Sequence, residues 1–321
     1  MRRVRRRRPT ATFETMRPEL FNVFDISFPA YFVLLITGFT FATVIAIVHA
    51  RKIGQNPDVI VDLALACLLL GVIGGRVFHV LFDGYFWDYV HLCTDPSKVD
   101  WPVSKAVCAS ERYRGVWDGL KGVCHPAERM CFRWAEFWAG GLVYYGGLVF
   151  AILGGIVLLK RDRFDPWKAA DLSAPGVALG LAFGRIGCLL AGCCFGTPST
   201  GPLALFFPHH SPASEAQAKA KLLGSVSLPA LSVHPTQVVE SLASLAVAAF
   251  CLLWVHGRKR YDGEVFLWFL GLYGLARFGL EFLRADDRGS AGGLSTSQVI
   301  SLLLMGAAVL VHRRRLPRPV L

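Results

Sequence analysis

The sequence predicts an all-α, polytopic membrane protein with about seven transmembrane helices, its N-terminus outside and its C-terminus inside, and a small extracytoplasmic head. Of its 321 residues, 54% are hydrophobic and only 18% are charged, and the mean hydropathy is +0.45. Soluble domains carry about 25% charged residues. The apolar residues also gather in runs of about the 20 residues that a helix needs to cross a bilayer. A soluble enzyme, a disordered chain and a disulfide miniprotein are therefore excluded.

Seven apolar runs are candidates for membrane spans, at about 28–49, 59–82, 136–159, 169–190, 235–255, 264–283 and 296–311. Glycine and arginine interrupt the second run between Gly71 and Arg76, and the fourth between Gly184 and Gly187. These two spans are the weakest by composition, but each has the required length.

The net charge of +11 lies mainly at the ends of these runs, which indicates membrane topology and not a nucleic-acid-binding face. Basic clusters follow at 51–52, 160–168, 258–260 and 313–318, and mark the cytoplasmic side. The arm 1–8, with six arginines, conflicts with an outside N-terminus. We favour translation from Met16; an inverted first span, or an arm that binds anionic lipid headgroups, is the alternative.

We expect a basic N-terminal segment, 1–27, and a single transmembrane domain, 28–321, with extracytoplasmic insertions at about 83–133 and 196–233. Four cysteines in the first insertion predict two disulfides, with three possible pairings, among Cys93, Cys108, Cys124 and Cys131. Free thiols, or a zinc site that uses His91 or His125, are alternatives, although the spacing fits no familiar zinc pattern. The second insertion is expected to form the small head.

Ionisable residues within a span are costly, so they mark candidate functional sites. Four places qualify: Gly74-Gly75-Arg76; Gly184-Arg185 through Gly196, with Cys188, Cys193 and Cys194; His234-Pro235-Thr236-Gln237 followed by Glu240; and Arg277 through Arg284, with Glu281. Arginine offers a planar fork of donors that suits phosphate. Arg277 and Glu281 are four residues apart and share a helix face. Together these residues predict an anion-binding cavity open to the outer leaflet.

Each place also has a purely structural interpretation. An arginine near a span end can extend its charge to the membrane interface, and Arg277 with Glu281 can form a buried structural pair. His234 can cap the helix that follows it. The three cysteines can be small apolar packing residues.

With these motifs the sequence resembles the prolipoprotein diacylglyceryl transferase family over most of its length. The resemblance is carried by Gly184-Arg185-Ile186-Gly187, by His234 to Glu240, by Tyr273 through Arg284 followed by Asp286 and Asp287, by Tyr31 before Gly38-Phe39, and by Gly74 to Arg76. Three residues depart from the family pattern: Tyr145 replaces a histidine, Cys188 an asparagine and Cys193 a glutamate. The Cys-bearing loop 83–133 is an addition.

The resemblance implies an enzyme that transfers a diacylglyceryl group from phosphatidylglycerol to the lipobox cysteine thiol of secreted prolipoproteins, the first step of lipoprotein maturation. It implies a multi-pass protein of the bacterial inner membrane, a monomer whose partners are phosphatidylglycerol, prolipoprotein signal peptides and membrane lipids. No nucleic acid, cofactor or metal is expected.

The same resemblance assigns roles to the candidate residues. Arg185 and Arg277 would hold the phosphate and stabilise the departing charge, and Glu281 would hold Arg277. In place of the histidine, Tyr145 or Glu240 would take the thiol proton, or the arginine field alone would favour the thiolate. The expected substrate-binding residues are Arg185, Tyr31, Gly187, Gly196, His234, Arg284 and Arg76.

Two other functions stay open at this point. One is a related membrane enzyme with altered thiol chemistry, such as thiol–disulfide exchange, at Cys188, Cys193 or Cys194. The other is a non-catalytic homologue that binds lipid or lipoprotein. A transporter is disfavoured because the sequence shows no paired inverted repeats.

Overall fold

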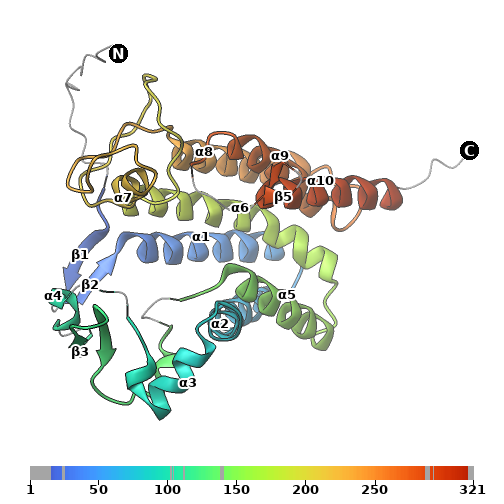
Figure 1. The fold of residues 1–321 in the computed structure, drawn as a ribbon. Helices are drawn as coiled ribbons and strands as arrows, with labels where there is room; N and C mark the ends of the chain where they lie inside the picture. Colours follow the sequence, from blue (N-terminus) through green and yellow to red (C-terminus); the bar gives the residue numbers. More distant parts are fainter. Residues whose placement is uncertain are drawn as a thin grey trace, which may run out of the picture. The chain divides into compact units, whose positions relative to one another are not determined.

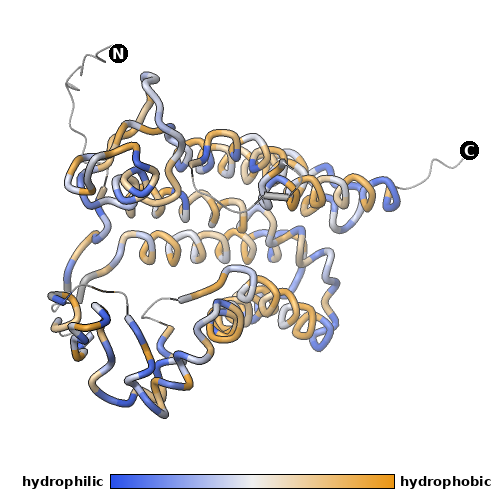
Figure 2. Tube along the Cα trace, in the orientation of Figure 1, coloured by the Kyte–Doolittle hydropathy of each residue, from blue (hydrophilic) through white to orange (hydrophobic). Residues whose placement is uncertain are grey.

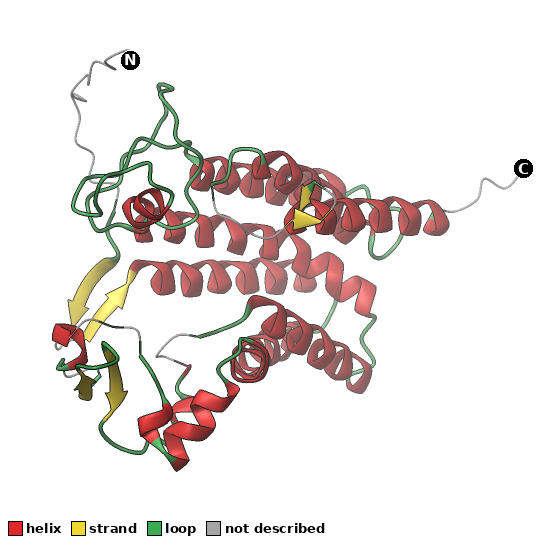
Figure 3. Cartoon of the chain, viewed as in Figure 1, coloured by secondary structure: helices red, strands yellow, loops and turns green. Residues whose placement is uncertain are grey.

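The structure, a computed structural model, describes residues 16–23, 26–101, 103, 105–110, 113–137, 141–285, 290–291 and 293–316. The basic arm 1–8, Asp286 and Asp287 lie outside the described residues. The chain divides into two compact units, the first Met1–Pro57 with Trp167–Leu321 and the second Asp58–Pro166. Helices dominate both (Figure 3).

Six described helices are long and apolar enough to cross a membrane: α1 (Ala30–Lys52), α2 (Pro57–Phe82), α5 (Tyr144–Arg161), α6 (Pro166–Ala191), α8 with the π-helical turn η4 (Thr236–Val255), and α10 (Thr296–Arg315). Between 11% and 39% of their most apolar stretches is buried, so most of each stretch is exposed. Figure 2 shows that hydrophobic residues predominate along the long helices. Exposed apolar surface suits lipid contact. The all-α, multi-pass membrane fold is thereby confirmed.

The remaining predicted span, at 264–283, corresponds to α9 (Glu264–Glu281), which has the same 18-residue length as α5. Its 18 residues include three charged ones, Glu264, Arg277 and Glu281, whereas each of the six apolar helices has an 18-residue stretch with at most two. Its predicted end at 283 is wrong, because Arg284 lies beyond the helix in an isolated bridge with Gly196.

The predicted start of the third span, at 136, is also wrong. α5 begins at Tyr144, and Glu136 instead follows the short helix η2 (Arg133–Ala135) and pairs with Arg133 at 2.6 Å. Gly141 has a φ of 70°, a left-handed conformation that glycine adopts readily and that interrupts a helix. The apolar run is therefore longer than the helix it contains.

In the first unit, a hairpin of β1 (Glu19–Val23) and β2 (Ile26–Pro29) leads into α1, which packs along α6 (Figure 1). A Cβ atom on Gly38 would lie 2.8 Å from the Phe183 Cβ, so these helices approach closely through small residues. α6, α8 and α9 share one apolar core, formed by Ala174, Ala178, Val247, Ala248, Cys251, Val255, Val265 and Phe269.

α10 packs against α9 in the same unit, where Gly274 admits the Met305 side chain. A hairpin of β5 (Ser290–Ala291) and β6 (Leu294–Ser295) precedes α10. Ser295 and Gln298 then form a reciprocal capping box that satisfies the first backbone donors of the helix. The start of α10 is thus fixed by its own sequence.

A buried carboxylate ties α6 to the start of α9. Asp171 is 0% exposed, and its Oδ2 accepts hydrogen bonds from Lys259 Nζ and the Gly263 amide, both at 2.9 Å. Its Oδ1 accepts from the Phe266 amide at 3.0 Å. Burial disfavours the charged form of Lys259, but the hydrogen bonds that it donates to Asp262 and Asp171 outweigh that effect and raise its pKa.

The basic helix ends of the first unit meet around this carboxylate. Arg260 pairs with Glu264 at 2.7 Å, Arg315 stacks over the Trp167 ring at 4.1 Å, and the rings of His49 and His256 are 4.4 Å apart. These contacts join the end of α1, the start of α6, the α8–α9 connection and the end of α10. We call this region the basic end.

The segment 196–233 forms a small packed body, which agrees with the predicted head. Its helix α7 (Pro212–Lys219) begins at Ser211, whose Oγ accepts a hydrogen bond from the Ser214 amide. Phe195, Phe207, Ala213, Ala230 and Val233 make up its core.

The second unit is built on α2 and α5, which cross at glycines. A Cβ on Gly74 would lie 2.5 Å from the Gly146 carbonyl oxygen. Likewise, a Cβ on Gly146 would lie 2.5 Å from the Gly74 carbonyl oxygen. The connection between them contains α3 (Phe86–Thr94), η1 (Pro96–Lys98), α4 (Lys105–Cys108), β3 (Gly115–Asp118) and β4 (Val123–Pro126).

Both predicted disulfides are present in this connection, as Cys93–Cys131 and Cys108–Cys124. The alternative zinc site and the free thiols are therefore wrong for these four cysteines. His125 Nδ1 instead lies 2.9 Å from the Val99 carbonyl oxygen.

Gly74→Ala should lower the free energy of unfolding by about 1–3 kcal/mol, because the added methyl group overpacks the α2–α5 crossing. The matched control is Gly306→Ala in α10, where nothing lies within 4 Å of the added Cβ. Thermal unfolding in detergent compares the two variants. Equal stability of the two would contradict the glycine crossing.

Asp171→Ala should lower the free energy of unfolding by about 1–3 kcal/mol, because the amides of Gly263 and Phe266 lose their acceptor and the half-buried Lys259 keeps only Asp262 as a partner. Asp162→Ala removes an exposed carboxylate at the end of α5 and serves as the control. The same unfolding measurement applies, and an Asp171 variant as stable as the control would rule out the tie between α6 and α9.

Candidate functional site

Charged side chains in the first unit gather around Glu240, near the start of α8. Its carboxylate pairs with Arg185 of α6 (Nε to Oε1, 3.1 Å) and with Arg284 beyond α9 (Nη1 to Oε2, 3.5 Å). The side chains of Glu240 and Arg284 are 5% and 2% exposed, and that of Arg185 is 18% exposed. We call these residues the Glu240 triad. One buried carboxylate thus joins three segments that are far apart in sequence.

Arg185 is the member of the triad that can best reach a ligand. Its Nη1 lies 3.9 Å from Cys188 Sγ, and its Nη2 has no hydrogen-bond or ion-pair partner among the described residues. A guanidinium that is held through Nε and keeps other donors available is suited to a phosphate oxygen. The sequence-based interpretation of Arg185 as an anion-binding residue therefore fits the geometry.

Backbone hydrogen bonds hold the segments around the triad together. The Gly196 amide donates to the His234 carbonyl at 3.3 Å, and the Thr197 amide donates to the Leu283 carbonyl at 2.8 Å. A Cβ on Gly196 would lie 2.7 Å from that Leu283 oxygen, so the approach requires glycine. Gly196 and His234, predicted to bind substrate, thus help to place Arg284 through their backbones.

The residues after His234 have roles that the sequence analysis did not assign. The start of α8 has no side-chain cap, so the capping interpretation of His234 is wrong. Thr236 Oγ1 donates to the Cys194 carbonyl at 2.9 Å, and Gln237 Nε2 donates to the Cys193 carbonyl at 2.8 Å. Both donor side chains are buried and fix the turn that follows α6.

Arg277 and Glu281 form the predicted pair on one face of α9. The distance from Arg277 Nη1 to Glu281 Oε2 is 2.6 Å, with side chains 8% and 7% exposed. Arg277 Nη2 also donates to Ser297 Oγ at 3.1 Å, which connects α9 to the start of α10. These contacts are compatible with the structural interpretation and with the positioning role of Glu281.

A cavity of about 270 Å³ between α8 and α9 brings Arg277 and Glu240 to one space. Ser244 and Tyr273 are its other polar lining residues, and the rest of its wall is apolar. A mostly apolar pocket with a few convergent polar groups is typical of a ligand site. Neither Ser244 nor Tyr273 was singled out as a site residue, and Ser244 had no signal in the sequence beyond its place on α8.

Tyr31 and Gly187 meet where α1 crosses α6. A Cβ on Gly187 would lie 3.0 Å from the Tyr31 Cα, so glycine permits this contact. Tyr31 is 44% exposed, and Gly187 is two residues along α6 from Arg185. Both predicted binding residues therefore lie beside the Glu240 triad.

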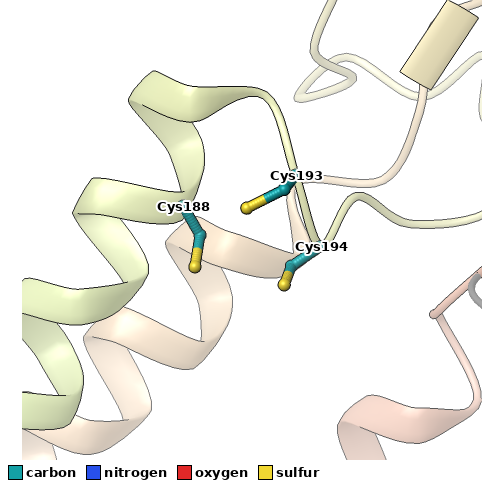
Figure 4. A group of neighbouring side chains, drawn as sticks. All are labelled: Cys188, Cys193 and Cys194. Atoms are coloured by element: carbon teal, nitrogen blue, oxygen red, sulfur yellow. The ribbon is translucent and has the colours of Figure 1, made fainter. Parts of the chain in front are cut away.

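Three cysteines cluster at the end of α6 (Figure 4). Cys188 is on the last turn of the helix, Cys193 and Cys194 are on the chain that follows, and all three sulfur atoms lie within 4.8 Å of one another. Hydrogen bonds with Cys188 and Cys193, supported by Arg284, hold the pKa of the Cys194 thiol well below its ordinary value. We call these residues the thiol cluster.

Arg76 and Tyr145 belong to the second unit. The Arg76 side chain is buried and donates to the carbonyl oxygens of Trp134 (2.6 Å), Arg133 (2.7 Å) and Gly141 (3.3 Å). This favours a structural role for Arg76, and its extension to the membrane interface is wrong. Tyr145, near the start of α5, is 54% exposed.

The model of one protein family, prolipoprotein diacylglyceryl transferase, matches residues 18–99 and 125–313. The unmatched stretch between them, 100–124, contains Cys108 and Cys124. The addition to the family pattern is therefore shorter than the predicted 83–133, and it contains the loop that the Cys108–Cys124 disulfide closes.

Individual relatives agree with this match. The chain is 28% identical to phosphatidylglycerol–prolipoprotein diacylglyceryl transferase 2 of Clostridium perfringens, over 92% of this chain and 94% of that protein. It is also 28% identical to the phosphatidylglycerol–prolipoprotein diacylglyceryl transferase of Clostridium tetani, over 92% of this chain and 96% of that protein. A relative in Dehalococcoides mccartyi is 32% identical over 54% of this chain and 62% of its own length. Since the family match spans most of the sequence and includes all three segments of the Glu240 triad, the chain belongs to the prolipoprotein diacylglyceryl transferase family.

Proposed function

We propose that this protein transfers a diacylglyceryl group from phosphatidylglycerol to the lipobox cysteine thiol of secreted prolipoproteins. The observation that carries the proposal is the Glu240 triad, in which one buried carboxylate orients two arginines from separate segments. The relatives that cover nearly all of this chain bear the name of that activity. The triad supplies what such a reaction needs, a positioned set of donors for a lipid phosphate.

The reaction forms one bond and breaks one bond. The acceptor sulfur, as thiolate, attacks the glyceryl carbon that carries the phosphate, and a carbon–sulfur bond forms. The bond from that carbon to the phosphate oxygen breaks, and glycerol phosphate leaves with the electron pair. Arg185, with donors directed away from Glu240, would stabilise the charge on the departing phosphate.

The cavity between α8 and α9 is the proposed place for the lipid. Its apolar wall suits acyl or glyceryl carbons, while Glu240 of α8 and Arg277 of α9 both line it. Glu281 holds Arg277, and Tyr31 packs against Gly187, two residues along α6 from Arg185. Arg284 is nearly fully buried, so its proposed role is to hold the triad.

The group that takes the thiol proton is a separate question. Both oxygens of Glu240 face arginines, which suits a positioning role. Tyr145 stands where the family pattern has histidine and is exposed. Both remain candidates for the proton acceptor in this proposal, beside direct stabilisation of the thiolate by the arginines.

We place the protein in the bacterial inner membrane, as a monomer, with the site toward the outer leaflet. In the first unit the basic end and the Glu240 triad lie at opposite ends of α6: 17 residues separate Lys168 from Arg185, a rise of about 25 Å. Because basic residues mark the cytoplasmic side, the triad falls on the other side. Prolipoproteins also present their lipobox at that face.

Arg185→Ala should reduce transfer by about 10²–10³-fold, the cost of losing one positioned donor. The test uses cells depleted of their own diacylglyceryl transferase and measures the mass of a reporter prolipoprotein. Arg51→Ala, at the exposed end of α1, is the matched control and should leave transfer intact. Arg185→Lys keeps the charge but loses the fork, so we expect an intermediate rate.

A mass gain of one diacylglyceryl group with wild type and with Arg51→Ala, lost with Arg185→Ala, supports the proposal. No gain from inserted, well-expressed wild type would refute it for that reporter. Full activity of Arg185→Ala would show that the triad is not the phosphate site.

Glu240→Gln should lower transfer about 10²-fold through misplacement of the arginines, without a change in the shape of the pH–rate profile. Tyr145→Phe is measured in parallel. If Tyr145 is the general base, the transfer rate of this variant should continue to rise with pH beyond the point where the wild-type rate levels off. A changed profile in Glu240→Gln would identify Glu240 as the proton acceptor instead of a positioning residue.

A further inference from the structure

The thiol cluster is prearranged by contacts that do not involve its sulfur atoms. The Cys193 amide donates to the Cys188 carbonyl at 3.1 Å. The side chains of Gln237 and Thr236 donate hydrogen bonds to the carbonyls of Cys193 and Cys194, respectively. Cys194 has a φ of 60°, a left-handed conformation that is uncommon for any residue other than glycine. The backbone therefore turns back so that three thiols converge.

Three convergent thiolates are a characteristic ligand set for zinc. Zn²⁺ binds cysteine sulfur at about 2.3 Å with tetrahedral geometry, which places ligand sulfurs about 3.8 Å apart. The three sulfur atoms already lie within 4.8 Å of one another, so small side-chain rotations complete the geometry. Catalytic zinc sites keep three protein ligands and leave the fourth position to water or substrate.

The surroundings of the cluster suit such a site. Three thiolates and one Zn²⁺ carry a net charge of −1. Arg185 Nη1 lies 3.9 Å from Cys188 Sγ and can donate to a metal-bound thiolate, the kind of outer contact that stabilises metal ligands. Cys188 is buried and the other two cysteines are half-buried, so the cluster is partly shielded from solvent.

The cluster also lies where the reaction takes place. Cys188 is within reach of Arg185, and Thr236 and Gln237, which hold the cysteine turn, begin the helix that carries Glu240. Cys188 and Cys193 stand at positions where the sequence departs from the pattern it resembles. A thiol held at this place would face the phosphate bound by Arg185.

We propose that Cys188, Cys193 and Cys194 bind one Zn²⁺, and that its fourth position holds the acceptor cysteine of the prolipoprotein as a thiolate. This inference rests on the proposed function. The acceptor thiol binds to zinc and releases its proton to water. Its sulfur then attacks the glyceryl carbon as glycerol phosphate leaves, and the thioether, a poor ligand, dissociates from the metal.

The first measurement is metal content of the full-length protein, purified in detergent without chelator and analysed by elemental mass spectrometry. We expect one Zn²⁺ per chain in wild type and none in Cys188→Ser/Cys193→Ser/Cys194→Ser. The control is Cys67→Ser/Cys251→Ser, which removes two free cysteines outside the cluster and should keep the metal. Co²⁺ substitution should give sulfur-to-cobalt charge-transfer absorption in wild type and in the control.

The second measurement is transfer by the same preparations. Removal of Zn²⁺ by a chelator should lower the transfer rate by more than about tenfold. Mutation of groups that only hydrogen-bond to metal ligands already lowers activity by that factor in metal enzymes. Zn²⁺ added back should restore it, and a cysteine-containing lipobox peptide should shift the Co²⁺ spectrum.

The outcomes separate this inference from the proposed function. Active wild type that contains no zinc, or a disulfide between two cluster cysteines, overturns the zinc site and leaves the transferase standing. Zinc-free protein that transfers at the full rate overturns the role of zinc in the reaction. A zinc-loaded cluster in a protein without transferase activity supports the site, and overturns both the proposed function and the acceptor position.

Discussion

The arrangement of the first unit depends on the negative charge of Glu240. Two guanidinium groups, from α6 and from the turn after α9, approach one carboxylate at the start of α8, and none of the three side chains is more than 18% exposed. Without that carboxylate two buried cations would repel each other, and the cost of an uncompensated buried charge is several kcal/mol. The packing of these segments and the position of Glu240 at the cavity beside Arg277 therefore depend on one carboxylate.

Much of this arrangement follows from local sequence. Hydropathy locates the apolar helices to within a few residues, except for the start of α5, because lipid contact requires long apolar runs. The spacing of Arg277 and Glu281 predicts their contact, since residues four apart share a helix face. Placement of the site residues near the outer ends of different spans also predicts that Arg185 and Glu240 converge. Family membership could be inferred from the order of these motifs and is confirmed.

Other features depend on tertiary contacts that no local pattern encodes. The run before Tyr144 is apolar enough for a helix, yet the left-handed Gly141 interrupts it. Arg76 has the appearance of a site residue, but three carbonyl oxygens surround its guanidinium. Likewise, the meeting of three thiols requires a turn fixed by Thr236 and Gln237 from a helix more than 40 residues away.

The two disulfides of the second unit impose an order on biogenesis. Cys93, Cys108, Cys124 and Cys131 have to be oxidised, whereas Cys188, Cys193 and Cys194 are free thiols. In the proposed orientation both groups reach the oxidising side of the membrane, and the four loop cysteines leave the ribosome first. Pairing within the loop before Cys188 emerges prevents scrambled bridges. The protein thus depends on the timing of its own oxidation, and a slow oxidant would favour misfolded isomers over the native chain.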